Sequence, residues 1–206
     1  MGRRQRRRRP DDDGRTPLHV ASGAGDSELV EHLLQRGAGA VVNAVDEDGW
    51  SPLQSAASAG HAVCAGLLLG AGADVRASNS GGRTAAHYAA SKGHAQVLKL
   101  LLDAGAGVDC QDVTGASPLH RAAATNQVAC IRLLCAAGAS LELRTKVGET
   151  PLLSAAASQA EQAVVALVSV GADASAVDSD GKTVRALLPK LSGVLSSLAA
   201  GEDVEL

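Results

Sequence analysis

The side chains that most often ligate metals or act as nucleophiles lack the spacing that such chemistry requires. The 206 residues include four cysteines without a CxxC pair and six histidines without metal-ligand spacing. No Ser/His/Asp, Cys/His, paired-carboxylate or phosphate-loop arrangement is present in the sequence. We therefore expect no enzyme activity, metal or cofactor. We interpret Cys64, Cys110, Cys130 and Cys135 as small hydrophobic residues in a reducing compartment.

An arginine-rich block occupies residues 3–9, where six of the seven residues are arginine, and Pro10 and Asp11–Asp13 follow it. This block predicts a disordered tail over residues 1–11, which either serves nuclear localisation or nucleic-acid binding or is simply solvated. The remaining chain carries 13 basic and 22 acidic residues. Because this balance repels phosphate, we expect a protein partner rather than nucleic acid. No apolar run approaches the roughly 20 residues of a membrane span.

The elements that must position a binding surface come from an internal repeat. A Thr or Ser anchor recurs at steps of 35, 33, 33, 33 and 33 residues, and a glycine lies two residues before each anchor. The anchors are Thr16, Ser51, Thr84, Ser117, Thr150 and Thr183. Thr and Ser are favoured helix N-caps, and the proline that follows four of them suits the first helical position. T-P-L-H-x-A at this period is the ankyrin signature. The sequence thus resembles an all-α ankyrin-repeat solenoid of helix-turn-helix units with β-hairpin loops.

The repeat register also predicts how each unit is held together. A glycine in the left-handed region can end the first helix, and Asn126 can replace it in the fourth repeat. Gln159 fits this position poorly, which predicts a looser turn in the fifth repeat. We expect His19, His87 and His120, the tetrapeptide histidines, to bond the anchor hydroxyl and nearby backbone.

The repeat period sets the expected domain boundaries and ends. We expect one elongated domain at 12–200, with repeats near 12–44, 46–78, 79–111, 112–144 and 145–177, a partial repeat at 178–200 and an acidic tail at 201–206. The open end of repeat one should expose Leu18, Leu29 and Leu33, since repeats bury apolar faces against their neighbours. A C-terminal cap helix is predicted from the helical spacing of Leu187, Leu191, Val194, Leu195 and Leu198.

A concave face in ankyrin stacks is lined by hairpin tips and first helices. It receives the residue before each anchor and the residues four and eight positions after it. By this register the face holds the single Trp, the single Tyr and several basic residues, and Trp, Tyr and Arg are enriched at interface hot spots. The alternative is that Trp50 packs structurally and the arginines are solvated. The predicted protein-binding residues are Arg15, Trp50, Arg83, Tyr88, Lys92, Arg121, Glu149 and Lys182.

Segments in successive repeats are similar to the gankyrin family, the ankyrin-repeat chaperones of the proteasome regulatory particle. These segments are Asp48–Gly60, Arg83–Lys92 and Pro118–Ala124, together with the opening stretch Arg15–Leu34. The resemblance extends from about Asp12 to about Leu198. It implies a non-enzymatic protein of the cytoplasm and nucleus that acts as a monomer without a small-molecule substrate. It also implies that the concave face grips the C-terminal domain of one ATPase subunit during regulatory-particle assembly.

Individual positions match or depart from that family. Arg15 matches a basic partner-contacting position, whereas Thr125 stands where the family often has lysine. Leu152–Ser158 lacks the LxCxE-like segment of animal members, so retinoblastoma-type binding is not expected. Asn43 lies in a V-N-A-V-D segment, a weak ankyrin-wide pattern for hydroxylation. The alternatives are a general ankyrin adaptor or kinase-inhibitor-like scaffold, a ubiquitin-ligase-recruiting module, and a basic-tailed nuclear interaction protein.

Overall fold

The computed structural model describes residues 11–36, 41–191 and 193. The chain divides into two compact units: unit 1 consists of residues 1–89 and 96–107, and unit 2 of residues 90–95 and 108–206. The described residues form helices and no extended strands, which confirms the all-α ankyrin-repeat class. The predicted hairpins appear as turns, with isolated bridges at Ser78–Thr84 and Val177–Thr183.

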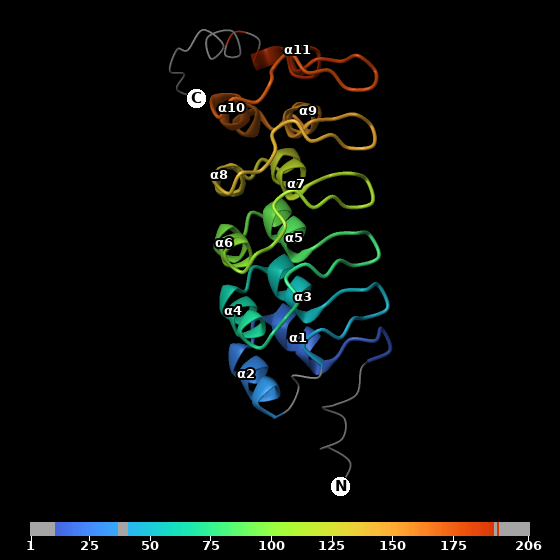
Figure 1. Cartoon of the computed structure of the whole chain (residues 1–206), viewed down its shortest axis with the longest axis vertical. Helices are drawn as coiled ribbons and strands as arrows, with labels where there is room; N and C mark the ends of the chain where they lie inside the picture. The colour runs from blue at the N-terminus through green and yellow to red at the C-terminus, as the bar shows by residue number, and fades with distance from the viewer. Residues whose placement is uncertain (1–10, 37–40, 192, 194–206) are drawn as a thin grey trace. The chain divides into compact units, whose positions relative to one another are not determined.

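Each repeat contributes a pair of short helices (Figure 1). Unit 1 contains α1 (Pro17–Ala24), α2 (Ser27–Gln35), α3 (Pro52–Ala59), α4 (Ala62–Gly70), the first part of α5 (Ala85–Lys92) and most of α6 (Ala95–Asp103). Unit 2 contains α7 (Pro118–Ala124), α8 (Val128–Ala136), α9 (Pro151–Ala157), α10 (Glu161–Ser169), α11 (Val184–Leu187) and the 3-10 helix η2 (Pro189–Leu191). In unit 1 α1 packs on α3, and in unit 2 α7 packs on α9.

Side-chain caps at the start of the first helix confirm the sequence prediction for Thr16, Ser51, Ser117, Thr150 and Thr183. Thr16 has extended backbone angles, and its side chain accepts a hydrogen bond from the backbone N–H of His19. The Nδ1 atom of His19 in turn accepts from the Thr16 backbone N–H at 3.0 Å. Gln54 does the same in repeat two, where its Oε1 accepts from the Ser51 N–H at 2.7 Å. Two backbone donors are therefore satisfied at each of these helix starts.

The turn between the two helices of a repeat is left-handed even where glycine is missing. Gly25 has φ 75°, and Asn126 has φ 59°, which confirms the prediction for the fourth repeat. Gln159 has φ 58°, so the prediction of a looser turn there is wrong. Its amide nitrogen donates to the carbonyls of Ala156 and Leu187 at 3.2 and 2.8 Å, and these bonds hold the turn closed.

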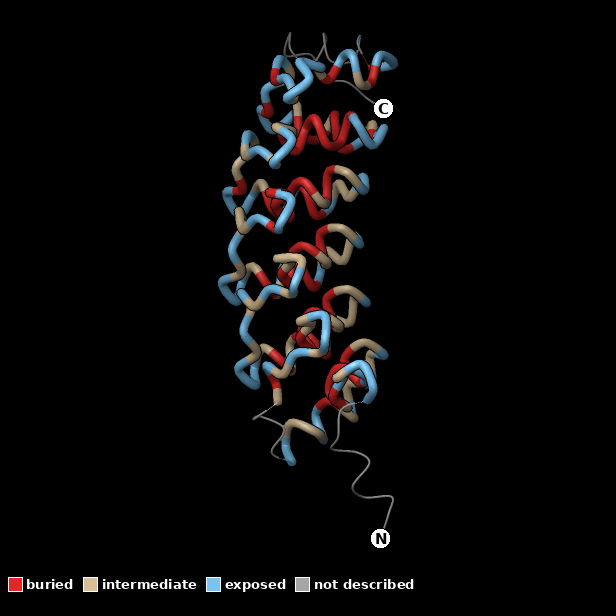
Figure 2. Tube along the Cα trace, turned by 90° about the vertical axis from the view of Figure 1, so that its right-hand side faces the viewer, coloured by how far each residue is buried: buried red, intermediate tan, exposed pale blue. Residues whose placement is uncertain are grey.

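The buried residues of each unit lie mainly on the helices (Figure 2), and most of the largest buried side chains are leucines. Ala56 and Ala122 are fully buried, and their small side chains permit the close approach of neighbouring helices. Leu18 is 1% exposed, so its predicted exposure at the open end is wrong, because α1 packs against both α2 and α3. Leu29 and Leu33 are half-buried.

Within the described residues, the predicted C-terminal cap helix is interrupted. α11 ends at Leu187, and Leu188 leaves the helical region with φ −135° and ψ 71°. Proline disfavours the helical conformation in the residue before it, so Pro189 accounts for the break. Leu188 and Leu191 are buried, whereas Leu187 is only half-buried. The predicted positions Val194, Leu195 and Leu198 lie outside the described residues.

Candidate protein-binding surfaces

The hairpins that carry the candidate residues are each organised by one side-chain oxygen. Asp46 Oδ1 accepts from the backbone N–H groups of Asp48 and Trp50 at 3.1 and 2.8 Å. The second bond fixes Trp50, which precedes the anchor and occupies the predicted contact position. Sequence reasoning missed this backbone-bonding role, although the residues recur five positions before each anchor and so carry the repeat period. The set is Asp11, Asp46, Asn79, Asp112, Thr145 and Asp178.

In unit 1 the structure stacks the two aromatic side chains that the sequence placed on one face. The rings of Trp50 and Tyr88 lie 4.3 Å apart between centroids and are tilted by 34°. The Tyr88 hydroxyl accepts from Asn79 Nδ2 at 2.7 Å, and His19 Nε2 lies 2.9 Å from the Trp50 carbonyl. Both rings are half-buried. Hydrogen bonds therefore hold the pair in position, and both side chains still present part of their surface to solvent.

Two predicted arginines hold the register position of Trp50 in the repeats before and after it. Arg15 forms ion pairs of 3.6 Å with both Asp13 and Asp46, and half of its side chain is exposed. Arg83 is half-buried, and its carbonyl accepts from Gln54 Nε2 at 2.7 Å. Val20, at the register position that Tyr88 occupies in repeat three, is 56% exposed. Unit 1 therefore presents an aromatic and aliphatic surface with basic neighbours.

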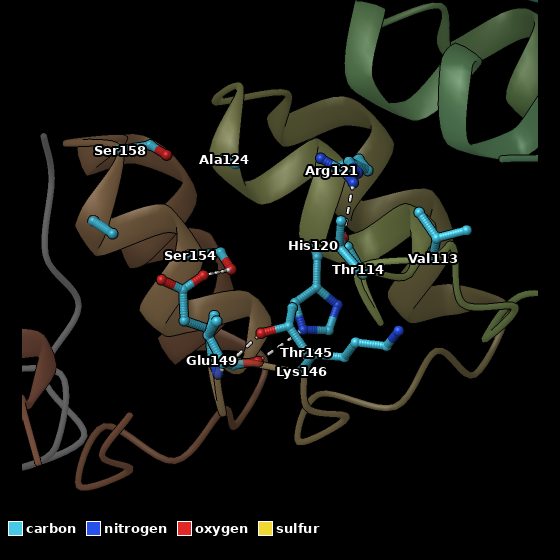
Figure 3. A pocket seen from close by; sticks show the side chains of 13 residues that line it. Val113, Thr114, His120, Arg121, Ala124, Thr145, Lys146, Glu149, Ser154 and Ser158 are labelled. Carbon is cyan, nitrogen blue, oxygen red and sulfur yellow. Dashed lines mark hydrogen bonds between the residues drawn. The ribbon is translucent and has the colours of Figure 1, made fainter. Parts of the chain in front are cut away.

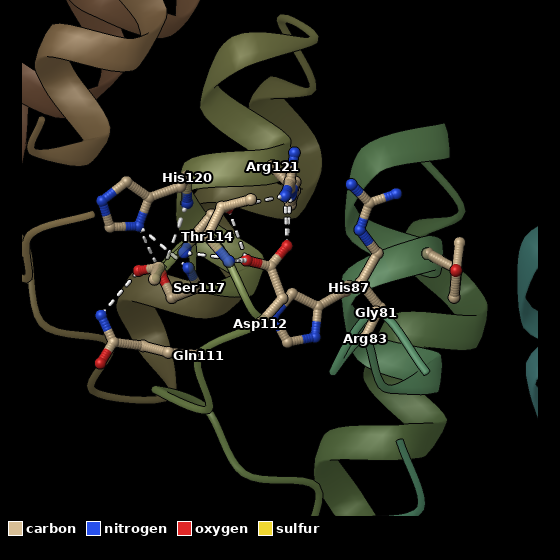
Figure 4. Close-up of polar contacts among 12 residues, drawn as sticks. Gly81, Arg83, His87, Gln111, Asp112, Thr114, Ser117, His120 and Arg121 are labelled. Carbon is tan, nitrogen blue, oxygen red and sulfur yellow. Dashed lines mark hydrogen bonds and ion pairs between the residues drawn. The ribbon is translucent and has the colours of Figure 1, made fainter. Parts of the chain in front are cut away.

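In unit 2 the predicted residue Arg121 already has a carboxylate partner within the chain. Its Nε and Nη2 atoms both donate to Asp112 Oδ2, and the Asp112 side chain is fully buried (Figure 4). Burial by itself would raise the pKa of Asp112. Hydrogen bonds from Thr114 and Arg121 outweigh that effect and hold the pKa well below its usual range. The pair is thus ionised and internally neutral, so Arg121 adds less positive charge to the surface than the sequence suggests.

A pocket of about 500 Å³ opens between the fourth and fifth repeats, inside unit 2 (Figure 3). It brings together two predicted residues, Arg121 and Glu149. The Glu149 carboxylate accepts from the Ser154 hydroxyl at 2.9 Å. Ala116, Ser154 and Ser158 also line the pocket, at positions that the repeat register assigns to the binding face. The lining residues outside that register are Val113, Thr114, His120, Ala124, Thr145, Lys146, Val147 and Ala157.

Comparison with known proteins identifies the repeat family. The family described as "Ankyrin repeats (3 copies)" matches residues 3–79, 23–112 and 64–145, which together run from residue 3 to residue 145, more than half of the chain. The chain belongs to the ankyrin-repeat family. Ankyrin repeats are protein-binding modules.

Curated relatives share shorter segments with this ankyrin-repeat protein. It is 42% identical over 59 residues to the 26S proteasome non-ATPase regulatory subunit 10 of Dictyostelium discoideum, which covers 29% of this chain and 25% of that protein. The Homo sapiens protein of the same name is 54% identical over 44 residues, or 21% and 19% of the two chains. Rabankyrin-5 of Homo sapiens is 46% identical over 57 residues, or 28% of this chain and 5% of that protein. The matched segments span a quarter or less of each relative.

The remaining two predicted residues are lysines outside the pocket of unit 2. Lys92 is exposed near the end of α5, and Lys182 pairs with Asp180 at 3.0 Å in the last hairpin. Neither lysine lines the pocket of unit 2. Their roles remain predictions from the repeat register.

Burial makes two cysteine thiols of this ankyrin-repeat protein poor nucleophiles. Burial raises the pKa of the Cys130 thiol to about 11 and also raises the pKa of Cys64, so both thiols are protonated near neutral pH. The described residues contain no cluster of His, Cys, Asp and Glu that could hold a metal ion. Within the same residues, no helix is long and apolar enough to cross a bilayer.

Proposed function

We propose that this ankyrin-repeat protein is a gankyrin-like chaperone that binds the C-terminal domain of an ATPase subunit of the proteasome regulatory particle, in the cytoplasm and nucleus. The observation that carries this proposal is the stacked Trp50–Tyr88 pair, flanked by Arg15 and Arg83. Partial similarity to proteasome non-ATPase regulatory subunit 10 from several organisms supports the choice of partner.

The geometry of the aromatic pair suits a binding hot spot. Large aromatic side chains with arginine neighbours supply most of the binding energy at many interfaces. Asn79 bonds the Tyr88 hydroxyl and His19 bonds the Trp50 backbone carbonyl, so the pair is held in position and a partner orders few additional side chains on binding. A pair that existed only for core packing would be fully buried, whereas both rings keep exposed surface.

Affinity capture from cell extract, followed by mass spectrometry, tests the proposal. The full chain should recover ATPase subunits of the regulatory particle as free assembly precursors, and mature 26S particles much less. The double variant Trp50→Ala, Tyr88→Ala should reduce this recovery at least about tenfold. Truncation of a hot-spot residue to alanine costs about 2 kcal/mol or more of binding free energy. Val63→Ala is the matched control, because Val63 is 67% exposed on α4 of the same unit.

A general ankyrin adaptor is the second candidate. The sequence identity to Rabankyrin-5 is 46% over 57 residues, and the identity to the Dictyostelium discoideum proteasome subunit is 42% over 59 residues. Recovery of kinases or ubiquitin ligases without any proteasome subunit would support the adaptor and refute the chaperone proposal. Unchanged recovery by the double aromatic variant would remove the Trp50–Tyr88 surface from the interface.

A further inference from the structure

We propose that the pocket of unit 2 binds an arginine side chain of the partner, an assignment that rests on the proposed protein-binding function. The repeat register explains why this pocket exists. Trp50 precedes the anchor of repeat two, and Tyr88 lies four residues after the anchor of repeat three. The equivalent positions in repeats four and five are Ala116 and Ser154, which both line the pocket. Because these side chains are small, the space that an aromatic pair fills in unit 1 is open in unit 2.

The walls of the pocket suit the aliphatic stem of a long basic side chain. Val113 and Val147 are 55% and 61% exposed, and both line the pocket. Ala124 and Ala157 also line it with small apolar side chains. Arginine buries its methylene groups on such surfaces while its charged end reaches a polar group.

Glu149 supplies the polar group that this charged end requires. Among the 13 residues that line the pocket, it is the one with a carboxylate. One of its oxygens accepts from the Ser154 hydroxyl, so the group is held in a fixed orientation. A carboxylate has about four acceptor sites, and one bond leaves room for the two parallel N–H donors of a guanidinium. Arginine fits this geometry better than lysine, which offers a single point charge.

The cations near the pocket do not neutralise Glu149. The Nε and Nη2 atoms of Arg121 both donate to the buried carboxylate of Asp112. In Figure 3 the ammonium group of Lys146 points away from the Glu149 carboxylate, toward the side of the pocket where Val113 lies. The pocket therefore combines an apolar channel with a negative end.

An NMR titration of the full chain with N-acetyl-arginine amide tests this assignment. The probe should bind with a dissociation constant on the order of 1 mM, as expected for a ligand of this size in an open pocket, and shift the methyl signals of Val113 and Val147. N-acetyl-citrulline amide has nearly the same shape without the charge, and it should bind at least about tenfold more weakly. Equal binding of the two probes would overturn the assignment.

Two variants locate the binding. Glu149→Gln should weaken the arginine probe about tenfold, because it keeps the side-chain shape and removes the charge. Glu161→Gln, a charge-matched control on α10 outside the pocket, should leave binding unchanged. Ser154→Tyr should fill the pocket as Tyr88 does in repeat three and abolish binding, with a melting temperature that shows an intact fold. Undiminished binding by either Glu149→Gln or Ser154→Tyr would refute the pocket as the arginine site.

The probe experiment contains no partner protein, so its failure is separable from failure of the proposed function. Arginine binding without capture of any ATPase subunit would refute the chaperone proposal and leave the pocket assignment supported. Capture of the ATPase subunit without arginine binding at Glu149 would support the chaperone proposal and refute the pocket assignment.

Discussion

At the scale of single residues, the hairpin oxygens show how one position adapts to its neighbours. Asn79 donates its amide to the Tyr88 hydroxyl, whereas Asp112 accepts from Arg121 nine residues further along the chain. In both repeats the Oδ1 atom of this residue accepts from the backbone N–H groups two and four residues later. The role in bonding the backbone is therefore the same in both repeats. The residue is neutral where it faces the Tyr88 hydroxyl and charged where it faces Arg121.

The buried Asp112–Arg121 pair yields a stability prediction. Arg121→Ala should lower the free energy of unfolding by about 2 kcal/mol, since it removes hydrogen bonds to a buried charge. Adding Asp112→Asn should recover most of this loss, because Asn79 performs the same backbone role without a charge. Urea denaturation of the single and double variants measures both values. A double variant no more stable than Arg121→Ala would show that the ion pair matters for another reason.

Ser22 provides a prediction of the opposite sign. Its hydroxyl is fully buried and lacks a hydrogen-bond partner among the described residues. The same register position holds Ala57, Ala90, Ala123 and Ala156 in the later repeats. Ser22→Ala should therefore raise the free energy of unfolding by about 1 kcal/mol, since an unsatisfied buried polar group is destabilising. Ser51→Ala, which removes a helix cap instead, should lower it by about 1 kcal/mol in the same assay.

At the scale of elements, polar bonds join successive repeats within each unit. His19 Nε2 lies 2.9 Å from the Trp50 carbonyl, and His120 Nε2 lies 3.1 Å from the Glu149 carbonyl. Gln54 makes the equivalent bond to Arg83. The side chain three residues after the anchor thus links each of these repeats to the residue before the next anchor. This link positions Trp50 and Glu149, the candidate contact residues.

Sequence reasoning recovered the elements that depend on local chemistry. The caps at Thr16 and Ser51 and the left-handed turn at Asn126 follow from side-chain type and period alone. The sequence did not indicate that Gln159 could hold the same turn, because its bond to Leu187 joins residues 28 positions apart. The pocket of unit 2 was also missed, since it results from small residues at positions where repeats two and three have aromatic ones.

The inter-repeat histidine gives unit 2 a dependence on pH. Burial lowers the pKa of His120, so the folded protein favours the neutral ring. Below a pH of about 6.5 the unfolded chain therefore binds more protons at this residue, and stability falls as the pH falls. The Asp112 carboxylate affects stability only at much lower pH, because its pKa is also lowered. We expect the free energy of unfolding to be lower at pH 5.5 than at pH 7.5.

The variant His120→Gln tests the source of this pH dependence. Glutamine makes the equivalent bonds at position 54 without titrating, so the variant should keep the fold and reduce the difference between pH 7.5 and 5.5. Denaturant titrations at the two pH values measure it. A difference that persists in full in the variant would assign the pH dependence to other groups.

At the scale of the whole molecule, stability should vary along the chain because repeats are stabilised by their neighbours. α2 of repeat one buries a single residue, Val30, whereas α4 in the same unit buries Cys64, Ala65 and Leu68. Local unfolding should therefore begin in repeat one, near Thr16–Gly37, before it reaches the central repeats near Thr84–Gly138.

Hydrogen exchange followed along the chain tests this order. The amides of α2 should exchange faster than those of α4, although the two helices have the same length and lie in one unit. Leu29→Ala should accelerate exchange in α2 further and leave α8 of unit 2 unaffected, because the local opening of one repeat does not require distant repeats to open. Equal protection of α2 and α4 would mean that repeat one is stabilised by contacts beyond those of its buried side chains. Global unfolding would then be the main route of exchange throughout unit 1.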